Sequence, residues 1–302
     1  MRFMMMIKSD PRSESGLLPE AKLLAEMAAF NDEMAKAGVM LSAEGLKASV
    51  HGARVRMSGT KLSVLDGPFS EARDLVGGFW LIQTASLEDA IAWAKRVPFS
   101  DREIELRQLY ELSDIPADPS ETADGWREQE RAFREGGASS DGGNAGAPPA
   151  PARKPGTTRY LVMLKSDRVT ESGALPTPRA LAEMGALMDD LATSGNLLGG
   201  EGLKPSAKGA KVRFAGGKRT VIDGPFTEAK EMIAGYSLIQ VPSKEDAVAL
   251  AKGWLKVHLE TSAEPLESGE IEIRALLERE DFPADATGTA ADGESGHKRL
   301  GN

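Results

Sequence analysis

The chain has 302 residues, of which 41% are hydrophobic and 27% charged, a composition typical of globular proteins and a length that suits two domains. The formal net charge of −9 and the lack of a long basic stripe argue against nucleic acid as the main partner. The absence of cysteine excludes disulfides, thiolate nucleophiles and sulfur-ligated metals.

The first residues, MRFMMMIKSD, predict a buried strand rather than a signal peptide, because the apolar run is short and no small-residue cleavage site follows it. No stretch reaches the roughly 18 apolar residues of a membrane helix. We therefore expect a cytoplasmic protein that does not bind membranes.

The first elements in chain order are a buried strand at Phe3–Lys8, a polar loop at 10–18 and a helix that opens at Pro19. Gly38 ends this helix in the manner of a C′ glycine. The apolar positions at helical spacing are Leu23, Leu24, Met27, Phe30, Met34 and Ala37.

The next elements complete one module. They are an extended segment at 39–46, a hairpin of 53–57 and 62–65, a buried strand at 79–83, a helix behind the N-cap Ser86 and an alternating strand at 103–110. The order β-α-β-hairpin-β-α-β is the α+β, ferredoxin-like arrangement, with both helices on one face of an antiparallel sheet.

The second half of the chain repeats the first. A shift of 157 residues aligns Lys8-Ser9-Asp10 with Lys165-Ser166-Asp167, and the DGPF segment at Asp66–Phe69 with the one at Asp223–Phe226. Roughly half of the aligned positions are identical, which indicates a tandem duplication. After Lys95 the shift that aligns the two copies changes from 157 to 167 residues, so the second copy carries ten extra residues there.

The repeat divides the chain into a module at 1–115, a flexible linker at 116–157 with a candidate short helix at Trp126–Glu135, a second module at 158–283 and a disordered tail at 284–302. The linker is long enough to let the open sheet faces of the two modules dock. We therefore predict that module 1 binds module 2 within one chain.

Both copies carry a long motif, DGPFSEARDLVGGFWLIQ and DGPFTEAKEMIAGYSLIQ. This motif, with Glu44-Gly45-Leu46 and the ending Glu103–Arg107, resembles the YCII-related family in its DGPF-type branch. The resemblance implies a dimeric α+β barrel. It also suggests a genomic association with extracytoplasmic-function sigma factors.

Some relatives in the family have a His–Asp pair proposed as catalytic, and a few act on halogenated aromatic compounds. None of His51, His258 and His297 lies in the first helix, where the resemblance places that histidine. The pair therefore does not carry over, and acid–base chemistry would use carboxylates, Lys8 or Lys165.

Asp66 and Asp223 are the candidate catalytic residues, as carboxylates at the mouth of a pocket. The alternative is structural: the Asp accepts backbone hydrogen bonds in a turn, Gly relieves strain, Pro fixes φ and Phe fills the core.

Six further charged residues, three in each copy, are candidate ligand-binding residues. Glu44 and Glu201 could form acidic pairs with Asp66 and Asp223, in which one pKa is raised. The cations could instead form internal salt bridges. The six residues are Lys8, Glu44, Arg107, Lys165, Glu201 and Arg274.

The aromatic residues differ between the copies: Trp80 aligns with Ser237, and Trp93 with Leu250. If both sheets face one central cavity, that cavity is asymmetric. The alternative is drift on the outer surface.

We predict a protein that binds or transforms a small molecule in a cavity between the modules, with no cofactor and no metal. Catalysis is left open. The alternatives are a protein-interaction or regulatory module associated with sigma-factor systems, and a structural pseudo-dimer without activity.

Overall fold

The computed structural model describes residues 1–70, 72–111, 114, 153–227 and 231–282. The candidate helix at Trp126–Glu135, most of the linker and the tail at 284–302 lie outside these ranges. Within them, no helix combines the length and apolar character that crossing a bilayer requires.

Module 1 follows the predicted element order. Its elements are β1 (Arg2–Lys8), α1 (Pro11–Glu14), α2 (Ala21–Lys36), β2 (Met40–Gly45), β3 (Ala53–Ser58), β4 (Lys61–Asp66), β5 (Val76–Gln83), α3 (Leu87–Ala94) and β6 (Glu103–Gln108). The Ser86 side chain caps α3 by accepting a hydrogen bond from the Asp89 amide, as predicted.

Module 2 repeats this order. Its elements are β7 (Thr158–Lys165), α5 (Arg168–Glu171), α6 (Pro178–Thr193), β8 (Leu197–Gly202), β9 (Ala210–Ala215), β10 (Lys218–Asp223), β11 (Ile233–Val241), α7 (Lys244–Thr261) and β12 (Ser268–Ala275). Short 3-10 turns at Ser49–His51 and Ser206–Lys208 precede the two hairpins. The ten extra residues of the second copy lengthen α7, which has 18 residues where α3 has 8.

One predicted loop is wrong. Residues 10–18 contain the short helix α1, and α5 takes the same place in module 2. Asp10 accepts a hydrogen bond from the Ser13 amide, and Asp167 caps α5 in the same way. The capping aspartate therefore starts a helical turn where the polar composition alone predicted irregular chain.

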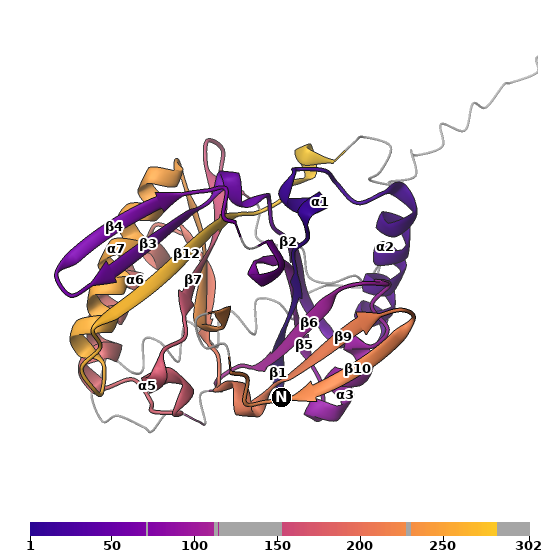
Figure 1. The fold of residues 1–302 in the computed structure, drawn as a ribbon. Helices are drawn as coiled ribbons and strands as arrows, with labels where there is room; N and C mark the ends of the chain where they lie inside the picture. The colour runs from indigo at the N-terminus through magenta and orange to yellow at the C-terminus, as the bar shows by residue number, and fades with distance from the viewer. Residues whose placement is uncertain (71, 112–113, 115–152, 228–230, 283–302) are drawn as a thin grey trace, which may run out of the picture.

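The hairpins are exchanged between the modules. One six-stranded sheet has the order β10-β9-β6-β1-β5-β2, and the other has the order β4-β3-β12-β7-β11-β8. In Figure 1 the purple β3–β4 hairpin accordingly lies beside the yellow β12, and the orange β9–β10 hairpin lies beside β6. Each sheet is thus completed by the other copy, which the sequence did not predict.

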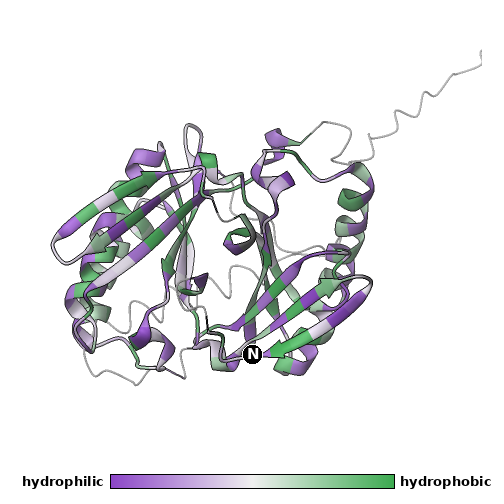
Figure 2. Cartoon of the chain, in the orientation of Figure 1, coloured by the Kyte–Doolittle hydropathy of each residue, from purple (hydrophilic) through white to green (hydrophobic). Residues whose placement is uncertain are grey.

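The sheets face each other and carry their helices on the outside (Figure 1). Alternation along β1 separates two cores: Met4 and Met6 pack between the sheets, whereas Phe3 and Met5 pack under α2 and α3. Hydrophobic and hydrophilic residues alternate instead along the exchanged strand β3, as Figure 2 shows. The inter-sheet core draws apolar residues from both modules. The fold class predicted from the sequence, two ferredoxin-like modules in a pseudo-dimeric α+β barrel, is confirmed.

Candidate functional site

Two buried charge clusters, related by the repeat, lie where the modules meet. The Glu272 cluster consists of Glu272, Lys165, Arg274, Arg54 and Glu14. The Glu105 cluster consists of Glu105, Lys8, Arg107, Lys211 and Glu171. Each cluster draws residues from both modules, because the exchanged hairpins supply Arg54 and Lys211.

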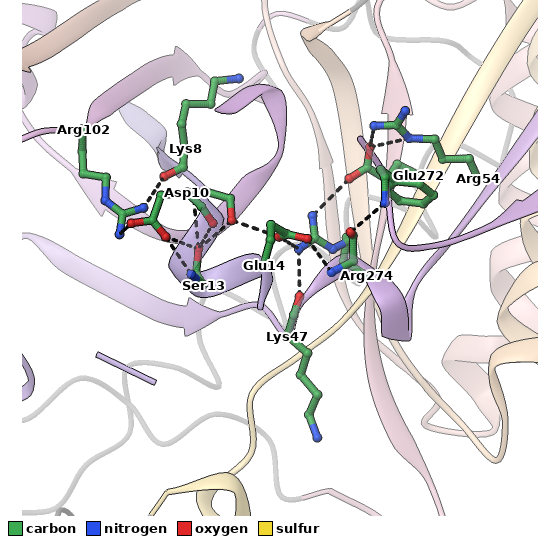
Figure 3. Close-up of polar contacts among 12 residues, drawn as sticks. Lys8, Asp10, Ser13, Glu14, Lys47, Arg54, Arg102, Glu272 and Arg274 are labelled. Atoms are coloured by element: carbon green, nitrogen blue, oxygen red, sulfur yellow. Dashed lines mark hydrogen bonds and ion pairs between the residues drawn. The ribbon is translucent and has the colours of Figure 1, made fainter. Parts of the chain in front are cut away.

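Arg274 is the centre of the first cluster. Its guanidinium contacts the Glu272 carboxylate at 3.3 Å and the Glu14 carboxylate at 3.1 Å, and it donates to the Lys47 carbonyl oxygen at 2.8 Å. Figure 3 shows Arg274 and Glu14 pointing toward each other, with Arg54 on the other side of Glu272. The side chain of Arg274 is 1% exposed, so the charges are withdrawn from water.

Glu14 connects this cluster to the DGPF turn. It accepts a hydrogen bond from the Ser49 amide at 2.8 Å, and the Ser49 hydroxyl accepts one from the Phe69 amide at 3.0 Å. A Cβ on Gly67 would lie 1.8 Å from the Ser49 carbonyl oxygen, so only glycine fits this approach. The Phe69 ring packs beneath Arg54, whose guanidinium carbon lies 4.1 Å from the ring centroid.

The second cluster repeats this geometry. Arg107 contacts Glu105 at 3.3 Å and Glu171 at 3.1 Å, and it donates to the Lys204 carbonyl oxygen at 2.7 Å. Lys8 lies 3.4 Å from Glu105. The four predicted cations thus lie in two groups, and each has a carboxylate partner inside the protein.

The two predicted glutamates lie elsewhere. Glu44 pairs with Arg159 at 2.7 Å, and Glu201 pairs with Arg2 at 2.6 Å. Burial raises the pKa of Glu44 above its usual value, although the charge of Arg159 opposes the shift. The shift arises from burial, and the acidic pair predicted between Glu44 and Asp66 is not its cause.

The predicted catalytic aspartates end the edge strands β4 and β10 and are both exposed. The Asp66 side chain is 66% exposed and contacts Lys244 at 2.6 Å. Within the part of the chain that the structure describes, no contact joins Asp66 to Glu44 or Asp223 to Glu201. The carboxylates accordingly line neither charge cluster, and their catalytic role stays a prediction.

The Glu272 cluster makes folding stability depend on pH. Burial alone would raise the pKa of Glu272, but the charges of Lys165, Arg274 and Arg54 outweigh it and lower the pKa from 4.5 to about 2. A folded-state pKa below the unfolded value gives stability that is fully present above pH 4.5 and is lost as the pH falls toward 2.

We therefore expect Glu272→Gln to lower the unfolding free energy by about 3 kcal/mol at pH 7, and by clearly less at pH 3. Urea unfolding of the wild type and the variant at both pH values measures the difference. A gap between the two proteins that stays constant with pH would rule out this linkage.

A cavity of about 550 Å³ lies in module 2, between α6, α7 and the helix-facing side of their sheet. It continues around the edge strand β8 to Arg2, Tyr110 and Glu111 of module 1. Its apolar walls come mainly from α6 and the sheet and include Val162, Leu164, Leu181, Met184, Met188 and Ile271.

The sequence difference between the copies explains why this space is open. In module 1, Trp80 is 4% exposed, packs edge-on against Phe30 with centroids 6.2 Å apart, and donates from its indole nitrogen to Asn31 at 2.9 Å. The equivalent of Trp80 in module 2 is Ser237, which lines the cavity. The predicted asymmetry is therefore present in the structure. It lies under the helices of module 2, whereas between the sheets apolar residues of both modules form a buried core.

The long α7 adds two side chains with polar atoms to the cavity wall. Trp254 and His258 both lie beyond the point that corresponds to the end of α3. The His258 Nε2 atom lies 2.7 Å from the Asp167 carboxylate, at the start of α5. Burial opposes ionisation of Asp167, but the hydrogen bond from His258 and those from backbone amides lower its pKa below the usual value.

This His–Asp contact adds a histidine to the carboxylates and lysines that the sequence offered for acid–base chemistry. Sequence reasoning missed it because the partners lie 91 residues apart and His258 belongs to a segment with no counterpart in module 1. In the described ranges, no group of three or more His, Asp or Glu side chains is placed to hold a metal ion.

The two ferredoxin-like modules exchange their hairpins and face each other through their sheets. This arrangement is an α+β barrel built from a tandem repeat. The family model of the YCII-related domain matches the chain twice, at residues 1–113 and 158–258. The chain therefore belongs to the YCII-related domain family. It is also similar to an uncharacterized protein of Rhizobium meliloti (strain 1021), with 30% identity over 98 residues, which are 32% of this chain and 73% of that protein.

Proposed function

We propose that the protein binds a small, mostly apolar molecule in the cavity of module 2. The observation that carries this proposal is the cavity of about 550 Å³ at the position that Trp80 fills in module 1. A cavity of roughly 300–1,000 Å³ with apolar walls and a few polar groups is typical of small-molecule sites.

Two separate differences between the copies support the same location. The Trp80-to-Ser237 change removes a large ring from the sheet face, and the longer α7 brings Trp254 and His258 to the space that results. In this proposal module 1 completes the barrel and closes one end of the site through Arg2. The small-molecule function is thus assigned to one copy rather than to a cavity shared by both.

Filling the cavity should abolish binding and leave the fold intact. Naphthalene, a small apolar molecule, is the probe for this site. Ser237→Trp places in module 2 the side chain that module 1 holds at the equivalent strand position, so we expect the affinity for naphthalene to fall by at least about tenfold. Equilibrium dialysis measures the affinity, and urea unfolding checks stability.

Ser237→Ala is the matched control, because it leaves the space open and should bind naphthalene as the wild type does. Equal binding by Ser237→Trp and the wild type would refute the location. A wild type that binds no naphthalene would favour the alternative of a structural pseudo-dimer.

A further inference from the structure

We propose that two copies of this chain associate edge to edge through strand β4, so that one sheet of each copy joins into a continuous sheet. β4 is the outer strand of the sheet β4-β3-β12-β7-β11-β8, and Figure 1 shows it at the rim of the molecule. All six of its residues are exposed, and no described strand pairs with its outer side. Such an edge presents backbone N–H and C=O groups that can pair with a strand of another chain.

The other three sheet edges carry features that hinder this kind of pairing. The pairings of β2 and β8 with β5 and β11 each contain an irregularity in register, and β10 carries Lys218 next to Arg219. β4 instead pairs with β3 without interruption from Lys61 to Asp66, and it has Leu62 where β10 has Arg219. Bulges and charged side chains are the usual protection of a sheet edge, so β4 is the least protected of the four.

The apolar side chains of β4 continue a core that is already present. Leu62 and Val64 lie opposite Met57 and Val55 of β3, and Val55 is fully buried in the core under α7. Leu62 is 38% exposed and Val64 is 41% exposed. A strand of a second copy beside β4 would cover both side chains and extend this core across the interface.

The strand is complementary to itself in the antiparallel direction, which points to a second copy as the partner. Antiparallel pairing brings the end that carries Lys61 to the end that carries Asp66 of the second copy, whereas parallel pairing would place like charges together. Facing residues of an antiparallel pair point to the same side of the sheet. A two-fold axis at Ser63 therefore places Leu62 opposite Val64 of the second copy, twice, and such a contact closes as a dimer.

A contact through one strand from each copy is small, so we expect a weak dimer that dissociates on dilution. Sedimentation velocity on the full chain should show monomers at about 1 µM and a large dimer fraction at about 500 µM. Leu62→Arg gives β4 the side chain that β10 carries, and it should raise the dimer dissociation constant by at least about tenfold. Thr220→Arg is the matched control, because it adds the same charge to the exposed edge of β10 and should leave the dimer unchanged.

A disulfide tests both the strand and its register, because the chain has no cysteine of its own. A two-fold axis at Ser63 makes the two Ser63 residues a non-hydrogen-bonded pair, with Cα atoms about 4.5 Å apart, which is within the range of a disulfide. Ser63→Cys should therefore form a covalent dimer under mild oxidation. Thr220→Cys, at the equivalent position of β10, should stay monomeric.

Three results would overturn the proposal. The first is a wild type that stays monomeric up to about 500 µM. The second is a dimer that Leu62→Arg and the wild type form equally well. The third is equal cross-linking of the two cysteine variants, because it would show that random collisions rather than β4 bring the copies together.

Discussion

Replacing Arg274 with Met should lower the unfolding free energy by about 3 kcal/mol, because buried Glu272 keeps only Lys165 and Arg54 as partners and Glu14 loses its cation. The Lys47 carbonyl also loses its donor. The loss should appear as a lower urea midpoint with an unchanged dependence on denaturant.

Two controls separate this effect from a general effect of removing an arginine. Arg168→Met breaks an ion pair whose side chains are both 60% exposed, and it should cost less than about 1 kcal/mol. The double variant Arg274→Met/Glu272→Met removes the buried carboxylate too, so it should be less destabilised than the sum of the two single variants. Additive losses would mean that Arg274 acts through packing alone.

Cutting the chain in the linker and separating the halves should abolish the folded monomer. Module 1 alone would lack the β9–β10 hairpin at β6, and its β3–β4 hairpin would lack β12. The inter-sheet core, which includes Met4, Met6, Leu161 and Met163, would be exposed to water in each half. We expect each separate half to self-associate or aggregate, and the halves co-expressed to purify as a one-to-one complex.

Size-exclusion chromatography with light scattering measures these states, and circular dichroism reports the fold. The uncut chain is the control. A half that remains a folded monomer on its own would show that the hairpin exchange is not needed for stability.

The local fold could be predicted from the sequence because local rules decide it. Gly38 follows α2 at a φ of +67° and Ser86 caps α3, and both positions carry a signal within a few residues. The exchange of hairpins could not be predicted in this way. Ala53–Ser58 has the pattern of a half-buried strand whether it pairs with β6 of its own module or with β12 of the other, so tertiary packing alone selects the partner.

The candidate site, like the fold, could be predicted from the sequence only in part. The sequence indicated that Lys8, Arg107, Lys165 and Arg274 lie at strand positions suited to ion pairs or ligand binding, and the structure gives each of them a carboxylate partner. The Trp80-to-Ser237 difference was visible in the alignment, but only the structure shows that this position faces α6. Trp254 and His258 carried no signal, because a single copy of a segment cannot be compared with its repeat.

Xenon binding in crystals of the full chain tests most directly whether the two copies have diverged into one filled module and one that carries a cavity. Xenon enters apolar cavities and gives strong anomalous scattering, so its position needs no assumption about the natural ligand. We expect a xenon site bounded by Ser237, Met184 and Trp254, and none beside Trp80. A crystal in which side chains fill this space and no xenon binds there would contradict the account.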